Sequence, residues 1–147
     1  MATAKTKSAS GASHLGSSLG LRATTTARLI EKVEQGIGFD KVHRLRKKLD
    51  VSQDEMARLL SIPVRTLDRR QKAGRLNELE SDRLLRLARV FEAATELFGG
   101  DEKLASAWLK EPARALGNVR PLDMARSDVG AREVEQLIGR IGHGVFT

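Results

Sequence analysis

The stretch SQDEMARLLSIPVRTLDRRQK, residues 52–72, decides the fold that this sequence predicts. Ser52 is placed to cap a first helix, because its hydroxyl can accept from the Glu55 amide while the Glu55 carboxylate reaches back. The letters SIP then interrupt that helix, and Pro63 suits the first turn of a second one, where its missing N–H is not needed. Two short helices joined by a tight turn form a helix-turn-helix, and this stretch therefore predicts one.

The inner faces of the two predicted helices are apolar, as a helix-turn-helix requires. Ala57 is the small residue expected where the helices cross, and the apolar set around it is Met56, Leu60, Ile62 and Leu67. Two positions depart from the usual pattern. Ser61 stands in the turn where glycine is common, and Arg70 stands where an apolar side chain is usual. Arg70 therefore predicts an altered end of the motif.

The outer face of the second helix is basic and predicts contact with DNA. Recognition helices place such side chains in the major groove, where arginine pairs bidentately with guanine. The candidates for base contact are Arg65, Thr66, Arg69 and Arg70, and the candidates for phosphate contact are Lys47, Lys48, Lys72 and Arg75. A helical hairpin with a solvated basic face is the alternative interpretation. One motif reads few base pairs, so specific binding to double-stranded operator DNA requires a homodimer.

The flanking sequence predicts further helices and no strands, so the fold class is all-α. Helix N-caps are expected at Thr26, Asp40, Asn77, Asp101 and either Ser127 or Asp128. We expect a disordered basic tail at residues 1–28 and a helix-turn-helix and dimerisation region at 29–95. A second, smaller helical domain is expected at 96–147.

Charge is spread unevenly over a chain whose net charge is +7. Residues 41–89 hold 14 basic and seven acidic side chains, whereas residues 90–147 hold seven and nine. This asymmetry indicates two surfaces with different partners. No apolar run is long enough to span a membrane, and residues 1–28 make a poor secretory signal. The absence of cysteine is compatible with a cytoplasmic protein.

Nothing in the sequence predicts an enzyme. It contains no nucleophile beside a base and no glycine-rich phosphate loop, so no small-molecule substrate or cofactor is expected. The lack of cysteine excludes a thiol nucleophile. His14, His43 and His143 lie far apart in the sequence, so no metal site is expected either.

The C-terminal third carries an ordered series of motifs. They are FGG at 98–100, WL at 108–109, Pro112, ALG at 115–117, PLDM at 121–124 and GAREVEQLIGRIGHGV at 130–145. This series resembles the toxin-binding domain of the MbcA/ParS/Xre antitoxins, and residues 40–95 resemble the Xre-like DNA-binding half of the same family. Apart from the resemblance, Trp108 is expected to anchor the core and Asp123 to cap a helix.

The resemblance implies an antitoxin of a type II toxin–antitoxin system. Its C-terminal domain would block the active site of a cognate RES-domain toxin that consumes NAD, and its DNA-binding half would repress the operon. The residues expected to contact the toxin are Arg126, Arg132, Glu133, Arg140, His143, Gly144, Val145 and Phe146. The arginines are chosen because a guanidinium pairs bidentately with phosphate or carboxylate.

Two other functions remain open at this point. A stand-alone transcriptional regulator would use its C-terminal domain only to dimerise or to sense a small molecule. A polar organiser protein would bind other proteins and never DNA. A neighbouring gene for a RES-type protein would favour the antitoxin, and salt-dependent DNA affinity would exclude the organiser.

Overall fold

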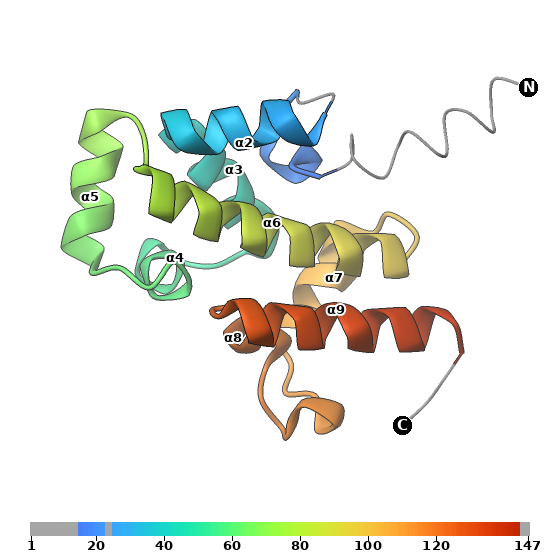
Figure 1. Ribbon diagram of the computed structural model, residues 1–147. Coiled ribbons are helices and arrows are strands. Elements are labelled where there is room, and N and C mark those ends of the chain that lie inside the picture. The colour runs from blue at the N-terminus through green and yellow to red at the C-terminus, as the bar shows by residue number, and fades with distance from the viewer. Residues whose placement is uncertain (1–14, 23–24, 145–147) are drawn as a thin grey trace, which may run out of the picture.

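The structure is a computed structural model that describes residues 15–22 and 25–144. Within these residues eight α-helices and two 3₁₀ turns form and no β-strand does, which confirms the predicted all-α class (Figure 1). The elements are η1 Ser17–Leu19, α2 Thr26–Gln35, α3 Phe39–Leu49, α4 Gln53–Leu59, α5 Val64–Ala73, α6 Glu78–Leu97, α7 Glu102–Leu109, η2 Arg114–Leu116, α8 Pro121–Met124 and α9 Asp128–Gly142.

Helix α6 runs through the centre of the molecule and packs against helices from both ends of the chain (Figure 1). It contacts α2 on one side and α7 and α9 on the other. Leu84, Leu87 and Phe91 of α6 are buried in a single hydrophobic core that also includes residues of α3 and α9. The predicted boundary between residues 95 and 96 falls inside α6, so the two expected regions share one helix and one core.

Four helices begin with a side-chain cap that the sequence predicts. The capping residues are Ser52, Asn77, Asp101 and Ser127, and each accepts a backbone N–H from the first turn of its helix. At Ser52 the hydroxyl accepts from the Glu55 amide at 3.1 Å, but the Glu55 carboxylate binds arginines instead of reaching back. The capping box is therefore complete at Asn77 and only half formed at Ser52.

Two expected caps are wrong. Thr25, one residue earlier than expected, caps α2 through its hydroxyl. Asp40 lies inside the first turn of α3, where its carboxylate pairs with Lys41 at 2.9 Å. The reason for the second shift is that the Phe39 N–H donates to the Gly74 carbonyl at 2.9 Å, which draws Phe39 into the helix and buries its ring.

The helix-turn-helix forms from α4 and α5. Ala57 and Leu67 are buried where the two helices meet the core. Ser61 adopts a φ of 58° in the turn, the left-handed conformation that glycine most easily supplies. Helix α5 begins at Val64 with Pro63 as its cap, and Gly74 ends it with a φ of 91°. The two helices and the turn between them thus form as the sequence predicts.

Residues 15–22 pack on the body of the protein. The Glu92 carboxylate on α6 accepts the backbone N–H groups of Gly16 at 3.1 Å and Ser18 at 2.9 Å, and also the Ser18 hydroxyl. Leu19 is fully buried. Residues 15–22 and the start of α2 belong to the segment that was expected to be a disordered tail, and for them that expectation is wrong. Residues 1–14 of the same segment lie outside the described part of the chain.

The C-terminal helices are joined by a close approach between α8 and α9. Gly130 is buried at the start of α9, and a Cβ placed there would collide with the Met124 carbonyl at the end of α8. Trp108 on α7 is half-buried against the core, with its ring centroid 6.5 Å from that of Phe98. None of the helices in residues 15–22 and 25–144 is long and apolar enough to cross a bilayer.

Candidate DNA and partner-binding surfaces

The outer face of α5 brings three of the predicted DNA contacts together. Arg65 and Arg69 are exposed, Thr66 is half-buried, and all three line one shallow hollow at the start of the helix. Asp68 lines the same hollow and supplies the acidic group on this face. The side chains that could reach base edges are therefore arranged as a recognition helix requires.

Arg70 does not share that face. Its guanidinium donates to both carboxylate oxygens of Glu80 on α6, at 2.7 and 3.0 Å, and Glu80 is only 3% exposed. Burial works against the charge of Glu80, but the hydrogen bonds from Arg70 and from the Asn77 N–H hold its pKa below the ordinary value. Arg70 thus ties the end of α5 to the start of α6, which is the altered end that its position in the motif predicts.

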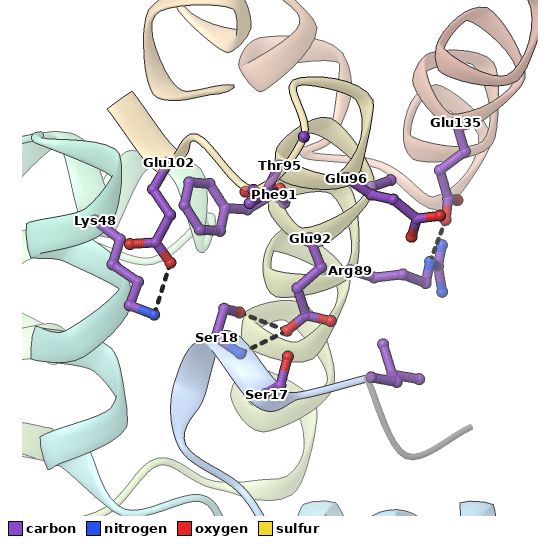
Figure 2. A pocket seen from close by; sticks show the side chains of 14 residues that line it. Ser17, Ser18, Lys48, Arg89, Phe91, Glu92, Thr95, Glu96, Glu102 and Glu135 are labelled. Atoms are coloured by element: carbon purple, nitrogen blue, oxygen red, sulfur yellow. Dashed lines mark hydrogen bonds and ion pairs between the residues drawn. The ribbon is translucent and has the colours of Figure 1, made fainter. Parts of the chain in front are cut away.

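The four predicted phosphate contacts lie in different surroundings. Lys47 and Lys72 are exposed. Arg75 donates to the Gln35 carbonyl at 3.0 Å and so links the end of the helix-turn-helix to α2. Lys48 pairs with Glu102 of α7 at 3.0 Å (Figure 2). That pair joins the end of α3 to the start of α7, so the ammonium group of Lys48 already has an acidic partner.

The predicted toxin contacts lie at two ends of α9. Arg132 and Glu133 are exposed near its start, and Arg132 pairs with Asp128 at 3.1 Å. Arg140 is half-buried, with its Nε atom buried, and His143 and Gly144 are exposed at the other end. The helix has 15 residues and is therefore about 22 Å long. Val145 and Phe146 lie outside the described residues.

Arg126 lies apart from the other predicted toxin contacts. It sits in the connection between α8 and α9 and lines a shallow hollow with Ser61, Pro63 and Val64 of the helix-turn-helix. The structure therefore places one residue that was assigned to the toxin beside the motif that was assigned to DNA.

A cluster of four charged side chains joins α4 to α8, and the sequence did not predict it. Arg58 donates to Glu55 and to Asp123, and Arg120 donates to the same two carboxylates, with donor–acceptor distances of 2.6–3.1 Å. Asp123, the expected cap, lies inside α8 and belongs to this cluster. The two pairs that join α4 to the α8 segment, Arg58–Asp123 and Arg120–Glu55, each span 65 positions, so no local sequence pattern predicts them.

The same cluster shifts two pKa values. A hydrogen bond from Arg58, opposed by the cost of burial and supported by a second bond from Arg120, lowers the pKa of Glu55 from 4.5 to about 2. For Asp123 the largest cause is the bond from Arg120, again opposed by burial and supported by Arg58, and the pKa falls from 3.8 to about 2. Both carboxylates are therefore ionised at neutral pH, and the cluster holds two full ion pairs.

Two hollows lie away from these surfaces. One is shared by η1, α3, α6, α7 and α9 and contains the pairs Lys48–Glu102 and Arg89–Glu135 (Figure 2). The other is an apolar groove between α2 and α6, where Ile30 is 52% and Leu79 is 60% exposed. Among the described residues no group of three His, Asp or Glu side chains is placed to hold a metal ion.

Comparison with known proteins connects both halves of the chain to one family. Residues 93–144 match the family described as the antitoxin Xre/MbcA/ParS C-terminal toxin-binding domain, and residues 28–89 match the antitoxin Xre-like helix-turn-helix domain. An antitoxin Xre from Yersinia enterocolitica is 36% identical over 130 residues, which is 88% of each chain. The chain belongs to the Xre antitoxin family.

Two further relatives support this assignment. An antitoxin Xre from Photorhabdus laumondii is 32% identical over 88% of each chain. A protein from a Sphingobium species named Prs ADP-ribosylating antitoxin is 27% identical over 124 residues, 78% of this chain and 77% of that protein. The family resemblance drawn from the C-terminal motifs is thus confirmed, and a toxin is the partner that the C-terminal family implies.

Proposed function

We propose that this Xre-family protein neutralises a cognate RES-domain toxin that consumes NAD, and that it represses its own operon by binding DNA. The observation that carries the proposal is the joining of a toxin-binding domain to a helix-turn-helix with an exposed basic face. The name of the Sphingobium relative adds support, because ADP-ribosylation uses NAD. We place both activities in the cytoplasm and assign no catalytic role to the chain itself.

The toxin surface that we propose follows α9 to its end. Arg132 and Glu133 offer charges of both signs to a partner, and His143 and Gly144 lead into Val145 and Phe146. Arg140 lies half-buried towards the same end of the helix, and a guanidinium can pair with a carboxylate of the toxin. Docking of this end into the toxin's active-site opening would block the entry of substrate.

One co-expression experiment tests both activities. The chain is expressed with the product of the adjacent gene, either complete or ended after Arg140. We expect the shortened chain to rescue growth poorly, because it lacks His143 to Phe146. A second variant, Arg65→Ala with Arg69→Ala, should lose operator binding in a mobility-shift assay and still rescue growth.

The outcomes separate the two activities. Full rescue by the chain ended after Arg140 would show that its end does not block the toxin, provided that circular dichroism finds the helices intact. If the double arginine variant lost both growth rescue and DNA binding, the two surfaces would not be separable. A neighbouring gene without a RES domain would contradict the proposed toxin class.

A homodimer completes the proposal. Specific binding by one helix-turn-helix needs two half-sites, and therefore a second copy of the chain. We place that copy on the apolar groove between α2 and α6, where Ile30 and Leu79 are exposed beside Leu29 and Leu85. Light scattering should give twice the chain mass of 16.1 kDa, and Leu79→Glu should halve the measured value. A monomer in the unmodified protein would contradict the assignment.

A further inference from the structure

The connection between α8 and α9 is held firmly on α6. Arg86 donates its Nε–H to the Ala125 carbonyl at 3.2 Å and a terminal N–H to the Arg126 carbonyl at 2.8 Å. The backbone of Arg126 therefore has a fixed place relative to the central helix. Its side chain is exposed.

That fixed place is beside the turn of the helix-turn-helix. Arg126 lines the same shallow hollow as Ser61 in the turn and Pro63 and Val64 at the start of α5. In helix-turn-helix complexes the N-terminal residues of the second helix contact base edges, and the first helix crosses the backbone. A cation beside the start of α5 consequently lies next to the phosphates that border the groove.

The charge of Arg126 is available to a partner. Its side chain has no hydrogen bond or ion pair with any of the described residues, unlike Arg58 in the same hollow, which Glu55 and Asp123 neutralise. Asp54 also lines the hollow, and its carboxylate takes no part in the ion pairs that Arg58 makes with Glu55 and Asp123. An exposed arginine on a fixed backbone is well suited to pair with a phosphate.

We propose that Arg126 contacts a DNA phosphate, so that the DNA surface extends from α5 onto the α8–α9 connection of the toxin-binding domain. The proposal rests on the proposed DNA binding, and it removes Arg126 from the toxin surface. DNA would then contact both parts of the chain at once. A toxin docked near the start of α9 would lie at the border of the DNA surface.

The test measures how DNA affinity depends on salt. The full-length chain is titrated into a labelled random-sequence duplex between about 50 and 200 mM salt, because phosphate contacts are independent of sequence and each contributes about 0.9 to the slope of log affinity against log salt. Arg126→Ala should lower the magnitude of the slope by about 0.9 for each chain bound. Arg126→Lys should keep the slope, since a phosphate accepts either cation.

Arg114→Ala is the matched control. It removes the same charge from an exposed position on η2, which packs on α9, and it should leave the slope unchanged. An unchanged slope in Arg126→Ala, together with weakened binding in Arg65→Ala with Arg69→Ala, would overturn the inference and keep the proposed function. Loss of toxin neutralisation in Arg126→Ala at normal DNA affinity would also overturn it. If the unmodified chain had no salt-dependent DNA affinity, both the role of Arg126 and the proposed DNA binding would be contradicted.

Discussion

At the scale of a residue, Gly130 determines how closely α8 and α9 can approach. The Met124 carbonyl occupies the space that a Cβ on residue 130 would need. The glycine is therefore required by a neighbouring backbone atom, which cannot move aside as a flexible side chain would. The packing of the whole C-terminal region depends on this contact, because α9 carries Val134 and Leu137 into the core.

We predict that Gly130→Ala destabilises the protein. The added methyl group is forced against the α8 backbone and should lower the free energy of unfolding by about 1–3 kcal/mol. Urea titration measures this as a lower midpoint at an unchanged slope. Gly139→Ala is the matched control on the same helix, because a Cβ there meets no atom within 4 Å. Replacing a helical glycine by alanine in open space should stabilise by about 0.5–1 kcal/mol. Equal shifts in both variants would contradict the assigned role of the Met124 carbonyl.

Single positions also show what the sequence can predict. Ser52, Asn77 and Ser127 cap helices as expected, because a cap depends on residues within one turn. Arg70 was recognised as unusual from its place in the motif, but its partner Glu80 was not. Glu92 could not be recognised at all, since the backbone groups that it accepts lie 74 and 76 positions away.

At the scale of elements, the four-residue charge cluster is the direct electrostatic link between the helix-turn-helix and α8. Glu55 and Arg58 belong to α4, whereas Arg120 and Asp123 come from the segment that forms α8. The distance in sequence explains why the cluster was missed. PLDM and SQDEM are separate motifs in the sequence, and nothing in either motif indicates that it contacts the other.

We predict that this cluster makes stability depend on pH. Glu55 and Asp123 have pKa values of about 2 in the folded chain, below their ordinary values of 4.5 and 3.8. The unfolded chain therefore binds more protons in this window, so the cluster stabilises the fold above about pH 5 and loses that effect as the pH falls towards 2. The double variant Glu55→Gln with Asp123→Asn should have a lower free energy of unfolding than the unmodified chain at pH 7. This difference should disappear as the pH falls towards 2.

Urea titrations at several pH values measure this gap. Glu111→Gln removes a negative charge from an exposed position outside the cluster and serves as the control. A constant gap between the unmodified chain and the double variant down to pH 2 would show that the two carboxylates are not held ionised by Arg58 and Arg120.

At the scale of the whole molecule, α6 makes the chain a single folding unit. Leu84, Leu87 and Phe91 of this helix contribute to one core that both regions share. The sequence predicted a helix that begins after the cap at Asn77, and this helix is α6. The sequence could not show that the parts have no separate cores, because that depends on which faces of α6 are covered.

We predict that both parts unfold together. Trp108 is the one tryptophan and reports on the C-terminal region, whereas far-ultraviolet circular dichroism reports on every helix. The two signals should follow the same urea curve. Leu67→Ala, a buried change in α5, should cost about 2–5 kcal/mol and move both curves equally. A tryptophan curve that stayed in place would mean that the C-terminal region folds independently.

The position of α6 also has a consequence for the evolution of the family. The helix-turn-helix match ends at residue 89 and the toxin-binding match begins at residue 93, so the border between them lies within α6. A recombination event at that border would join half of a central helix from one ancestor to half from another, with mismatched packing on both sides. If the proposed DNA binding holds, operator preference and toxin preference should be inherited as a pair, and new combinations should arise by gradual substitution on the two surfaces.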